Sequence, residues 1–284
     1  MNIQWYPGHM TKAKRMMQEN LKIIDLIIEI VDARLPLSSR NPEIDDLVGN
    51  KPRLMLLNKA DIADSKLNEA WEKYFEKKGI SAYAVSSISG KNFNFVFEKC
   101  KVLLADKIQR EKEKGIVNRP IKIMICGVPN VGKSSFINKL SGRKSAITGD
   151  RPGVTKGKQW IRLKNGFELL DTPGILWPKF DDEAVGLKLA YTGAIKDEII
   201  DTEELACNLL EYLKENYPQA LEARYKMTDF NDLKGYELLE YLGKKRGFVV
   251  SGGEINTERA AGILLDEFRA ARLGNITLEK PSDF

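Results

Sequence analysis

The segment GVPNVGKS, residues 127–134, constrains this chain more than any other part of its sequence. It fits the pattern G-x-x-x-x-G-K-[ST] and stands between a predicted strand, IKIMIC, and a helix predicted to begin near Lys133. In that context the glycines let backbone N–H groups close around phosphate oxygens, Lys133 reaches the β- and γ-phosphates, and the Ser134 hydroxyl is a ligand for Mg²⁺. The segment therefore predicts a nucleotide site; the alternative is a glycine-rich turn without a ligand.

A second motif, DTPG at residues 171–174, follows an apolar strand predicted at residues 167–170. A carboxylate at such a strand end can hold a water of Mg²⁺, and a glycine three residues later can offer its N–H to a γ-phosphate. Alone, D-x-x-G is usually a turn. Because it follows the phosphate loop along the chain, we predict that Asp171 and Gly174 belong to the same site.

A third motif, NKAD at residues 58–61, ends another buried strand predicted at residues 54–57. This pattern suits guanine, because the Asp61 carboxylate can accept hydrogen bonds from both ring N1–H and the exocyclic amine, a donor pair that adenine lacks. The stem of Lys59 can cover the face of the base. The alternative is that Asp61 caps a helix.

Three further residues match nucleotide chemistry only weakly when each is taken alone. Ser86 and Ser87 follow a strand predicted at residues 82–85 and could offer backbone N–H groups to guanine O6. Thr155 stands between the phosphate-loop helix and the DTPG strand, where its hydroxyl could reach Mg²⁺ when a loop closes over a γ-phosphate. In isolation, Thr155 would more often be an ordinary loop threonine.

The composition indicates a folded protein of about two domains. The chain has 284 residues, of which 43% are hydrophobic, too many for a disordered chain. No segment approaches the ~18 apolar residues of a membrane span, and the N-terminal sequence has no apolar signal core. The three cysteines are widely spaced, which excludes a CxxC metal site and indicates free thiols in a reducing cytosol. We therefore expect a cytoplasmic protein with no membrane partner.

The charge is divided unevenly along the chain. The net charge is +5, with +13 on residues 1–180 and −8 on residues 181–284. Two modules with different partners explain this pattern, and a mosaic of solvated surfaces is the alternative. The stretch 143–164 holds seven cations and one carboxylate, so we expect it to be the main RNA contact.

Short apolar strands alternate with helices up to about residue 178, which is typical of an α/β fold whose parallel sheet is covered on both faces. Beyond that point, nearly every segment has helical spacing. We predict an α/β domain at residues 1–178 and an all-helical domain at 179–284. The expected helices are 10–22, 67–78, 93–114, 183–195, 202–216, 218–226, 233–245 and 256–273, and the expected strands include 26–31 and the antiparallel pair 159–163 and 167–170.

The order of the motifs carries a resemblance to a known family. The base motif precedes the phosphate loop, whereas it follows the phosphate loop in ordinary Ras-like GTPases. This order resembles the circularly permuted P-loop GTPases. The opening WYPGHM, the DARLP segment at residues 32–36 and the helical tail make the chain similar to the bacterial GTPases that act in assembly of the large ribosomal subunit.

The resemblance implies a role for each matching residue and a bound GTP or GDP with Mg²⁺. Guanine is bound by Asn58, Lys59, Ala60 and Asp61, with Ser86 and Ser87 closing the pocket. The phosphates are wrapped by Asn130, Val131, Gly132, Lys133, Ser134 and Ser135. Ser134 and Thr155 ligate Mg²⁺, Asp171 holds it through water, and Gly174 senses the γ-phosphate.

Three positions bear on the hydrolysis step. Ile175 follows the DTPG motif where Ras-like proteins place a glutamine, so no amide there can orient water. Asn130 matches the position where some relatives hold K⁺, whose charge could replace that of an arginine finger. His9, the one histidine, could orient or deprotonate water, or it could pack under the N-terminal segment or contact RNA.

The resemblance implies a GTP hydrolase, slow alone and stimulated by a ribosomal particle. Its expected partner is an immature large ribosomal subunit, through rRNA and ribosomal proteins, with no membrane and no DNA partner. It would promote a late assembly step and leave after hydrolysis. The alternative is a GTP-gated switch that binds another RNA or protein and hydrolyses little GTP.

Overall fold

The protein divides into a sheet-containing unit and a helical unit. Among the described residues, the helical unit spans residues 180–276, and the sheet-containing unit holds residues 8–178 together with residues 277–284. The computed structural model describes residues 8–90, 92–93, 95–116, 119–142, 159–163, 166–178, 180 and 182–284, without the side chains of His9 and Gln159.

Within the described residues, six strands form one sheet in the order β3-β2-β1-β4-β6-β5. All neighbouring strands run parallel except the edge pair of β5 and β6, which is antiparallel. The predicted α/β fold with a parallel central sheet is therefore confirmed. The strands are β1 (Leu26–Asp32), β2 (Arg53–Asn58), β3 (Ser81–Ala84), β4 (Ile121–Cys126), β5 (Gln159–Arg162) and β6 (Phe167–Asp171).

The central strands are apolar over almost their whole length because both of their faces are covered. Every residue of β1 is buried, and β2 is buried from its second residue onward. The register pairs Asp32 at the end of β1 with Asn58 at the end of β2. This register brings the carboxyl ends of the central strands to one edge of the sheet.

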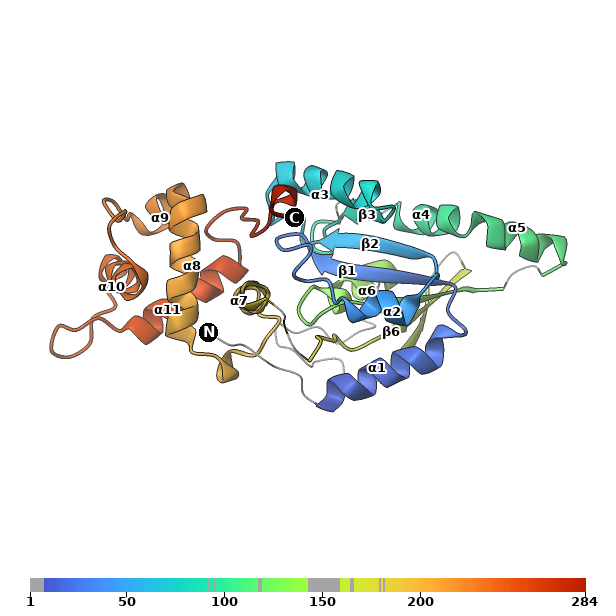
Figure 1. Cartoon of the computed structure of the whole chain (residues 1–284), viewed down its shortest axis with the longest axis horizontal. Coiled ribbons are helices and arrows are strands. Elements are labelled where there is room, and N and C mark those ends of the chain that lie inside the picture. Colours follow the sequence, from blue (N-terminus) through green and yellow to red (C-terminus); the bar gives the residue numbers. More distant parts are fainter. Residues whose placement is uncertain are drawn as a thin grey trace. The chain divides into compact units, whose positions relative to one another are not determined.

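Helices of the sheet-containing unit cover both sides of the sheet, and Figure 1 shows α1 and α3 flanking β1 and β2 from opposite sides. Asp64 caps α3 by accepting hydrogen bonds from two backbone amides of its first turn. Trp71 and Phe75 on α3 are buried in a cluster with Met55 and Leu57 of the sheet. The helices are α1 (Gly8–Leu21), α2 (Glu43–Val48), α3 (Ser65–Lys77), α4 (Val96–Leu103), α5 (Ala105–Glu113) and α6 (Lys133–Ser141).

Three details differ from the sequence-based expectations. The helix expected over 93–114 is two helices, α4 and α5, which meet at Leu104. Leu104 is buried, as are Val96 and Cys100 on α4, whereas α5 buries no residue, so only the first half has an apolar face to hold it against the sheet. The six-residue helix α2 is too short for a periodic pattern to predict it. Val249 and Ile255 form an isolated antiparallel bridge, which the sequence-based expectations did not include.

The helical unit packs around α8, a 15-residue helix whose start is capped by Asp201. Figure 1 shows α9, α10 and α11 around α8. Leucines such as Leu209 on α8, Leu242 on α10 and Leu264 on α11 are fully buried and form its core. The helices are α7 (Glu183–Tyr191), α8 (Thr202–Asn216), α9 (Pro218–Tyr225), α10 (Gly235–Lys245) and α11 (Thr257–Arg269).

The end of the chain differs from our sequence-based division, which includes it in the helical domain. Residues 277–284 pack in the sheet-containing unit. The backbone N–H of Leu278 donates to the carbonyl of Arg34 at 2.6 Å, and the indole N–H of Trp71 donates to the carbonyl of Glu279 at 3.1 Å. No periodic pattern marks this segment in the sequence, because its contacts are with residues far away along the chain.

In the described part of the chain, no helix is long and apolar enough to cross a membrane. No cluster of three or more His, Cys, Asp or Glu residues there could hold a metal ion by itself.

Candidate nucleotide site

Three of the predicted motifs follow three strands at the same edge of the sheet. NKAD follows β2, the phosphate loop follows β4, and DTPG follows β6. Because these strands run parallel, their carboxyl ends open to one side, which is where open α/β sheets bind their ligands. The fold thus places together motifs that lie far apart in the sequence.

The phosphate loop between β4 and α6 depends on two of its glycines. Gly127 has a φ of +150°, and a Cβ added there would lie 2.2 Å from the carbonyl oxygen of Ile30. Gly132, with a φ of +92°, would place a Cβ 2.4 Å from Nδ2 of Asn58. Only glycine fits at either position. Asn130 adopts a left-handed conformation with a φ of 59°, which closes the turn.

Lys133, the first residue of α6, folds back over the loop that precedes it. Its ammonium donates to the carbonyl of Gly127 at 3.1 Å and to that of Val128 at 2.9 Å. Burial lowers the pKa of Lys133 to about 8, and Asp171 opposes this shift. A cation held against backbone carbonyls in a buried loop suits an anionic ligand, whose phosphates would favour the charged ammonium.

Asp171 ends β6 and is buried, with an exposed fraction of 1%. Among the described residues, no group donates a hydrogen bond to its Oδ1 atom. Burial raises the pKa of Asp171 to about 6, although Lys133 and the amide of Thr172 lower it. A buried carboxylate oxygen of this kind fits an Mg²⁺ ion with its shell of water. Ser134, on the first turn of α6, is the other described candidate for that ion.

The DTPG loop is fastened to the phosphate loop. The hydroxyl of Thr172 donates to the carbonyl of Ile125 on β4 at 2.6 Å, and the amide of Ile175 donates to the carbonyl of Gly127 at 3.3 Å. A Cβ at Gly174 would lie 2.7 Å from the backbone nitrogen of Pro129 and 2.9 Å from the ammonium of Lys133. Gly174 therefore touches both the loop and its lysine.

Ile175 is buried, with an exposed fraction of 5%. Asn41, also buried, donates from Nδ2 to the carbonyl of Ile175 at 3.2 Å. A small apolar recess there is lined in part by Met17 of α1 and Ile44 of α2. The residue after DTPG is thus a packing residue, with its backbone fixed by an asparagine that the sequence analysis missed.

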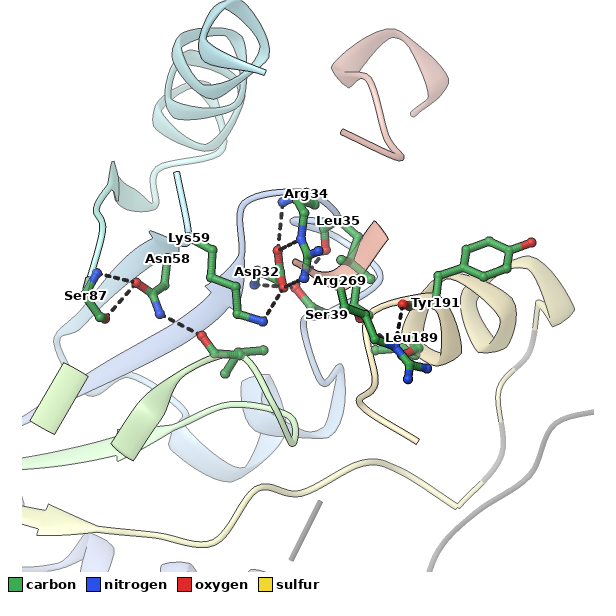
Figure 2. Close-up of polar contacts among 12 residues, drawn as sticks. Asp32, Arg34, Leu35, Ser39, Asn58, Lys59, Ser87, Leu189, Tyr191 and Arg269 are labelled. Carbon is green, nitrogen blue, oxygen red and sulfur yellow. Dashed lines mark hydrogen bonds and ion pairs between the residues drawn. The ribbon is translucent and has the colours of Figure 1, made fainter. Parts of the chain in front are cut away.

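Asn58 joins the base motif to both of its neighbours (Figure 2). Its Nδ2 donates to the carbonyl of Val131 in the phosphate loop at 2.8 Å. Its Oδ1 accepts from the amide of Ser87 at 3.1 Å and from the hydroxyl of Ser87 at 2.8 Å. One buried side chain therefore sets the spacing between the base-side loops and the phosphate loop.

The remaining residues of the base motif lie along the same edge. Lys59 has a left-handed φ of 63°, and its ammonium lies 3.0 Å from Oδ2 of Asp32 (Figure 2). The amide of Ala60 donates to the carbonyl of Val85 at 3.0 Å, which fastens the motif to the loop that carries Ser86. Ser86 is fully buried and accepts a hydrogen bond from the amide of Ser89. Asp61 is half-buried at the next turn.

Some of the predicted site residues fall outside the description. Thr155 and most of the basic stretch 143–164 lie outside the described residues, as does the side chain of His9 on α1. The sequence marks Asp32 only as part of the DARLP segment. A charged residue at the end of each of two apolar strands is the signal that could have predicted its contact with Lys59.

The family comparison agrees with the arrangement of the motifs. Residues 122–240 match the model of the family described as 50S ribosome-binding GTPase. That match begins at β4 and omits the base motif, as expected when the order of motifs is permuted. A protein of Bacillus licheniformis named ribosome biogenesis GTPase A is 50% identical over 283 residues, which is 100% of both chains.

Two solved structures are similar over nearly the whole chain. The structure described as GDP-bound TM YlqF has a TM-score of 0.68 and 29% identity, and the comparison covers 95% of this chain and 100% of that one. GNP-bound YlqF from T. maritima has a TM-score of 0.65 and 29% identity, with 96% and 100% covered. Both of these similar proteins were thus solved with a nucleotide.

Proposed function

Because the chain belongs to the ribosome biogenesis GTPase A family, we propose that it binds an immature large ribosomal subunit in its GTP state, promotes a late assembly step and leaves after hydrolysis. The chain is a GTP hydrolase that acts in ribosome assembly. The large subunit as target, the late step and release on hydrolysis are the proposal. The full-length similarity at 50% identity is the observation that carries it.

Guanine binds at the base motif. Asp61 accepts the two hydrogen bonds of N1–H and the exocyclic amine, and the stem of Lys59 covers the base. Ala60, Ser86 and Ser87 close the pocket. The contacts of Asn58 with Val131 and Ser87 support this arrangement, because they hold the base side and the phosphate loop at one spacing.

The phosphates bind at the loop after β4. Backbone amides of residues 130–135 wrap them, and Lys133 moves its ammonium from the loop carbonyls to phosphate oxygens. Ser134 and Thr155 would ligate Mg²⁺, and Asp171 would hold it through water. When bound there, the ion would supply positive charge to the phosphate oxygens. Gly174 senses the γ-phosphate with its amide.

Hydrolysis by the free protein is slow. Ile175 is buried and offers no side-chain group to orient the attacking water. Asn130 would hold K⁺, which would supply positive charge that an arginine finger would otherwise bring. His9 is the candidate for orienting or deprotonating the water when the particle is bound. On this proposal, hydrolysis becomes fast only when the ribosomal particle is bound.

The surface that contacts the ribosomal particle is proposed from the distribution of charged residues along the chain. The excess of cations in residues 1–180 supports an rRNA contact through the basic stretch 143–164, and the helical domain supplies a second contact to the particle. A protein with these partners works in the cytoplasm, without membrane or DNA partners.

The test is sedimentation of cell extract on a sucrose gradient with a non-hydrolysable GTP analogue, GDP or no nucleotide. We expect the protein to follow an immature large-subunit particle with the analogue and to stay at the top with GDP. Co-sedimentation with the small subunit, or with the same particle in all three conditions, would contradict the proposal.

A second candidate function rests on the buried Ile175. The chain would then be a GTP-gated switch for another RNA or protein, with very little hydrolysis. A single-turnover hydrolysis assay with purified large-subunit precursors separates the two. Acceleration by the particle favours the ribosomal function, and an unchanged slow rate favours the switch.

A further inference from the structure

Beside the proposed guanine site lies a buried acidic group that the proposed mechanism does not use. Asp32 ends β1 with an exposed fraction of 1%. Its carboxylate accepts from Nε of Arg34 at 3.0 Å, from Nη2 of Arg34 at 2.8 Å and from the amide of Arg34 at 3.0 Å. Lys59 completes the set from the neighbouring strand end, 3.0 Å away. Asp32 thus holds the one lysine of the base motif.

This position of Lys59 is fixed by its surroundings. Its left-handed φ is uncommon for a residue with a side chain, and such a conformation persists where neighbouring bonds determine it. The amide of Ala33 donates to the carbonyl of Asn58 at 2.7 Å. The segment around Asp32 is therefore tied to the base motif through both backbone and side chain.

The loop after Asp32 is in turn held by the C-terminal segment, residues 277–284. The fully buried carboxylate of Glu279 accepts from the amide of Leu37 at 2.8 Å and from the amide of Ser38 at 3.2 Å, and the hydroxyl of Ser38 also donates to it. The carbonyl of Arg34 accepts from Leu278. A buried carboxylate with several donors is costly to replace, because those donors would be left unpaired.

The same segment reaches the other side of the base motif. The hydroxyl of Thr277 accepts from the amide of Asp64 at 2.9 Å. Asp64 caps α3 and stands three residues after Asp61. The C-terminal segment therefore contacts residues on both sides of the loop that carries NKAD.

We propose that Asp32 and Glu279 are positioning residues for guanine binding, so that the C-terminal segment forms part of the base half of the nucleotide site. Asp32 sets Lys59 directly, and Glu279 sets the loop that carries Arg34. This inference rests on the proposed assignment of guanine to NKAD. It gives the C-terminal end of the chain a part in retaining nucleotide.

The experiment uses the full-length chain with Asp32→Asn or Glu279→Gln. It measures the dissociation rate of ribose-labelled GDP, and the affinities for GDP and inorganic pyrophosphate. Pyrophosphate occupies only the phosphate loop. We expect GDP to dissociate roughly tenfold faster and to bind correspondingly more weakly, while pyrophosphate affinity stays within twofold. A merely structural role would weaken both ligands alike.

The chain offers matched controls for both positions. Asp25 is a buried carboxylate next to the opposite end of β1, paired with Lys107 and Arg119. Glu267 is a buried carboxylate of the helical unit, paired with arginines. Asp25→Asn and Glu267→Gln should leave GDP dissociation within twofold of the unmutated chain.

A double-mutant cycle keeps the proposal testable where Asp32→Asn lowers stability. If Asp32 acts through Lys59, the Lys59→Met background should show no further loss of GDP affinity when Asp32→Asn is added. Additive losses, or losses of GDP no larger than the controls give, overturn the inference. If the unmutated chain binds GDP no better than ADP, the guanine assignment itself fails, which is a separate and recognisable outcome.

Discussion

At the scale of single residues, Gly174 shows how closely the two phosphate-binding loops approach each other. Its Cα lies where any side chain would meet Pro129 and the ammonium of Lys133. DTPG, which alone in a sequence usually indicates a turn, thus contacts the phosphate loop in the folded chain. The absence of a side chain lets the backbone of Gly174 approach the phosphate loop closely.

Gly174→Ala should therefore reduce GTP affinity more than GDP affinity. The added methyl lies 2.7 Å from Pro129, and overpacking of this kind costs about 1–3 kcal/mol. The DTPG loop must move away from the γ-phosphate position, whereas GDP has no γ-phosphate to lose. Titration with fluorescent GDP and a GTP analogue measures the ratio. Gly262→Ala, in the helical unit, serves as the control. An unchanged ratio would remove Gly174 as the sensor.

A second residue-scale prediction concerns acid stability. Burial alone would raise the pKa of Asp32, but Arg34 and Lys59 hold it well below its ordinary value of 3.8. The folded state then binds fewer protons than the unfolded state, so this contribution to stability is present above about pH 4 and is lost as the pH falls further.

We expect the free energy of unfolding to differ most between the unmutated chain and Asp32→Asn near neutral pH, with the difference shrinking below about pH 4. Urea unfolding followed by tryptophan fluorescence measures it. All four tryptophans precede residue 180 in the sequence, so the signal reports the sheet-containing unit. A difference that stays constant down to about pH 3 would contradict this role for Asp32.

At the scale of elements, two helical glycines have opposite surroundings. Gly262 on α11 is exposed, and an added Cβ there meets nothing within 4 Å. An added Cβ at Gly243 on α10 would lie 2.3 Å from Cγ2 of Ile255. The same substitution should therefore act in opposite directions at the two sites.

Gly262→Ala should raise the free energy of unfolding by about 0.5–1 kcal/mol, because alanine is the better helix former. Gly243→Ala gains the same propensity but must displace a β-branched side chain, so we expect a net loss of about 1 kcal/mol or more. Thermal unfolding followed by circular dichroism compares them. Stabilisation by both substitutions would show that Ile255 can move aside.

The sequence predicted the elements whose signal is local. The apolar run of β1, the Gly-Lys-Ser signature before α6 and the capped α11 all follow from neighbouring residues, and each lies within a few residues of its expected position. The order of the three nucleotide motifs also predicted the permuted fold. These features need no knowledge of distant contacts.

The features that the sequence did not predict depend on distant partners. Asn41 and Glu279 are isolated polar residues in the sequence, and their partners Ile175 and Ser38 lie 134 and 241 residues away. The break at Leu104 is also not marked by the sequence: Leu104 and part of α4 are buried, whereas α5 buries no residue. Neither hydrophobic periodicity nor a sequence motif predicts such long-range contacts, so they are seen only in the folded chain.

At the scale of the whole molecule, the helical unit is an insertion in the chain of the sheet-containing unit. One junction, after residue 179, follows the DTPG loop at the phosphate half of the site. The other, before Thr277, precedes the segment that holds the base half. The helical unit is thus covalently joined to both halves. A target that pulls on it could act on either junction.

Nucleotide binding and docking of the C-terminal segment should strengthen each other. If the C-terminal segment strengthens nucleotide binding, nucleotide must strengthen the docking of that segment by the same factor, because coupling between two binding events is symmetric. The amides that report docking are those of Leu37, Ser38 and Leu278, each bonded between the segment and its loop. Their exchange with solvent requires the segment to detach.

We therefore expect saturating GDP to slow hydrogen exchange by roughly tenfold in the peptides that contain the amides of Leu37, Ser38 and Leu278, in line with the expected coupling. Peptides from the core of α8 serve as the control, because their amides are bonded within a helix of the other unit. Mass spectrometry of the full-length chain, with and without nucleotide, gives both rates. In Glu279→Gln the segment should exchange fast in both conditions. Equal exchange in the unmutated chain with and without GDP would show that the segment is docked independently of the nucleotide.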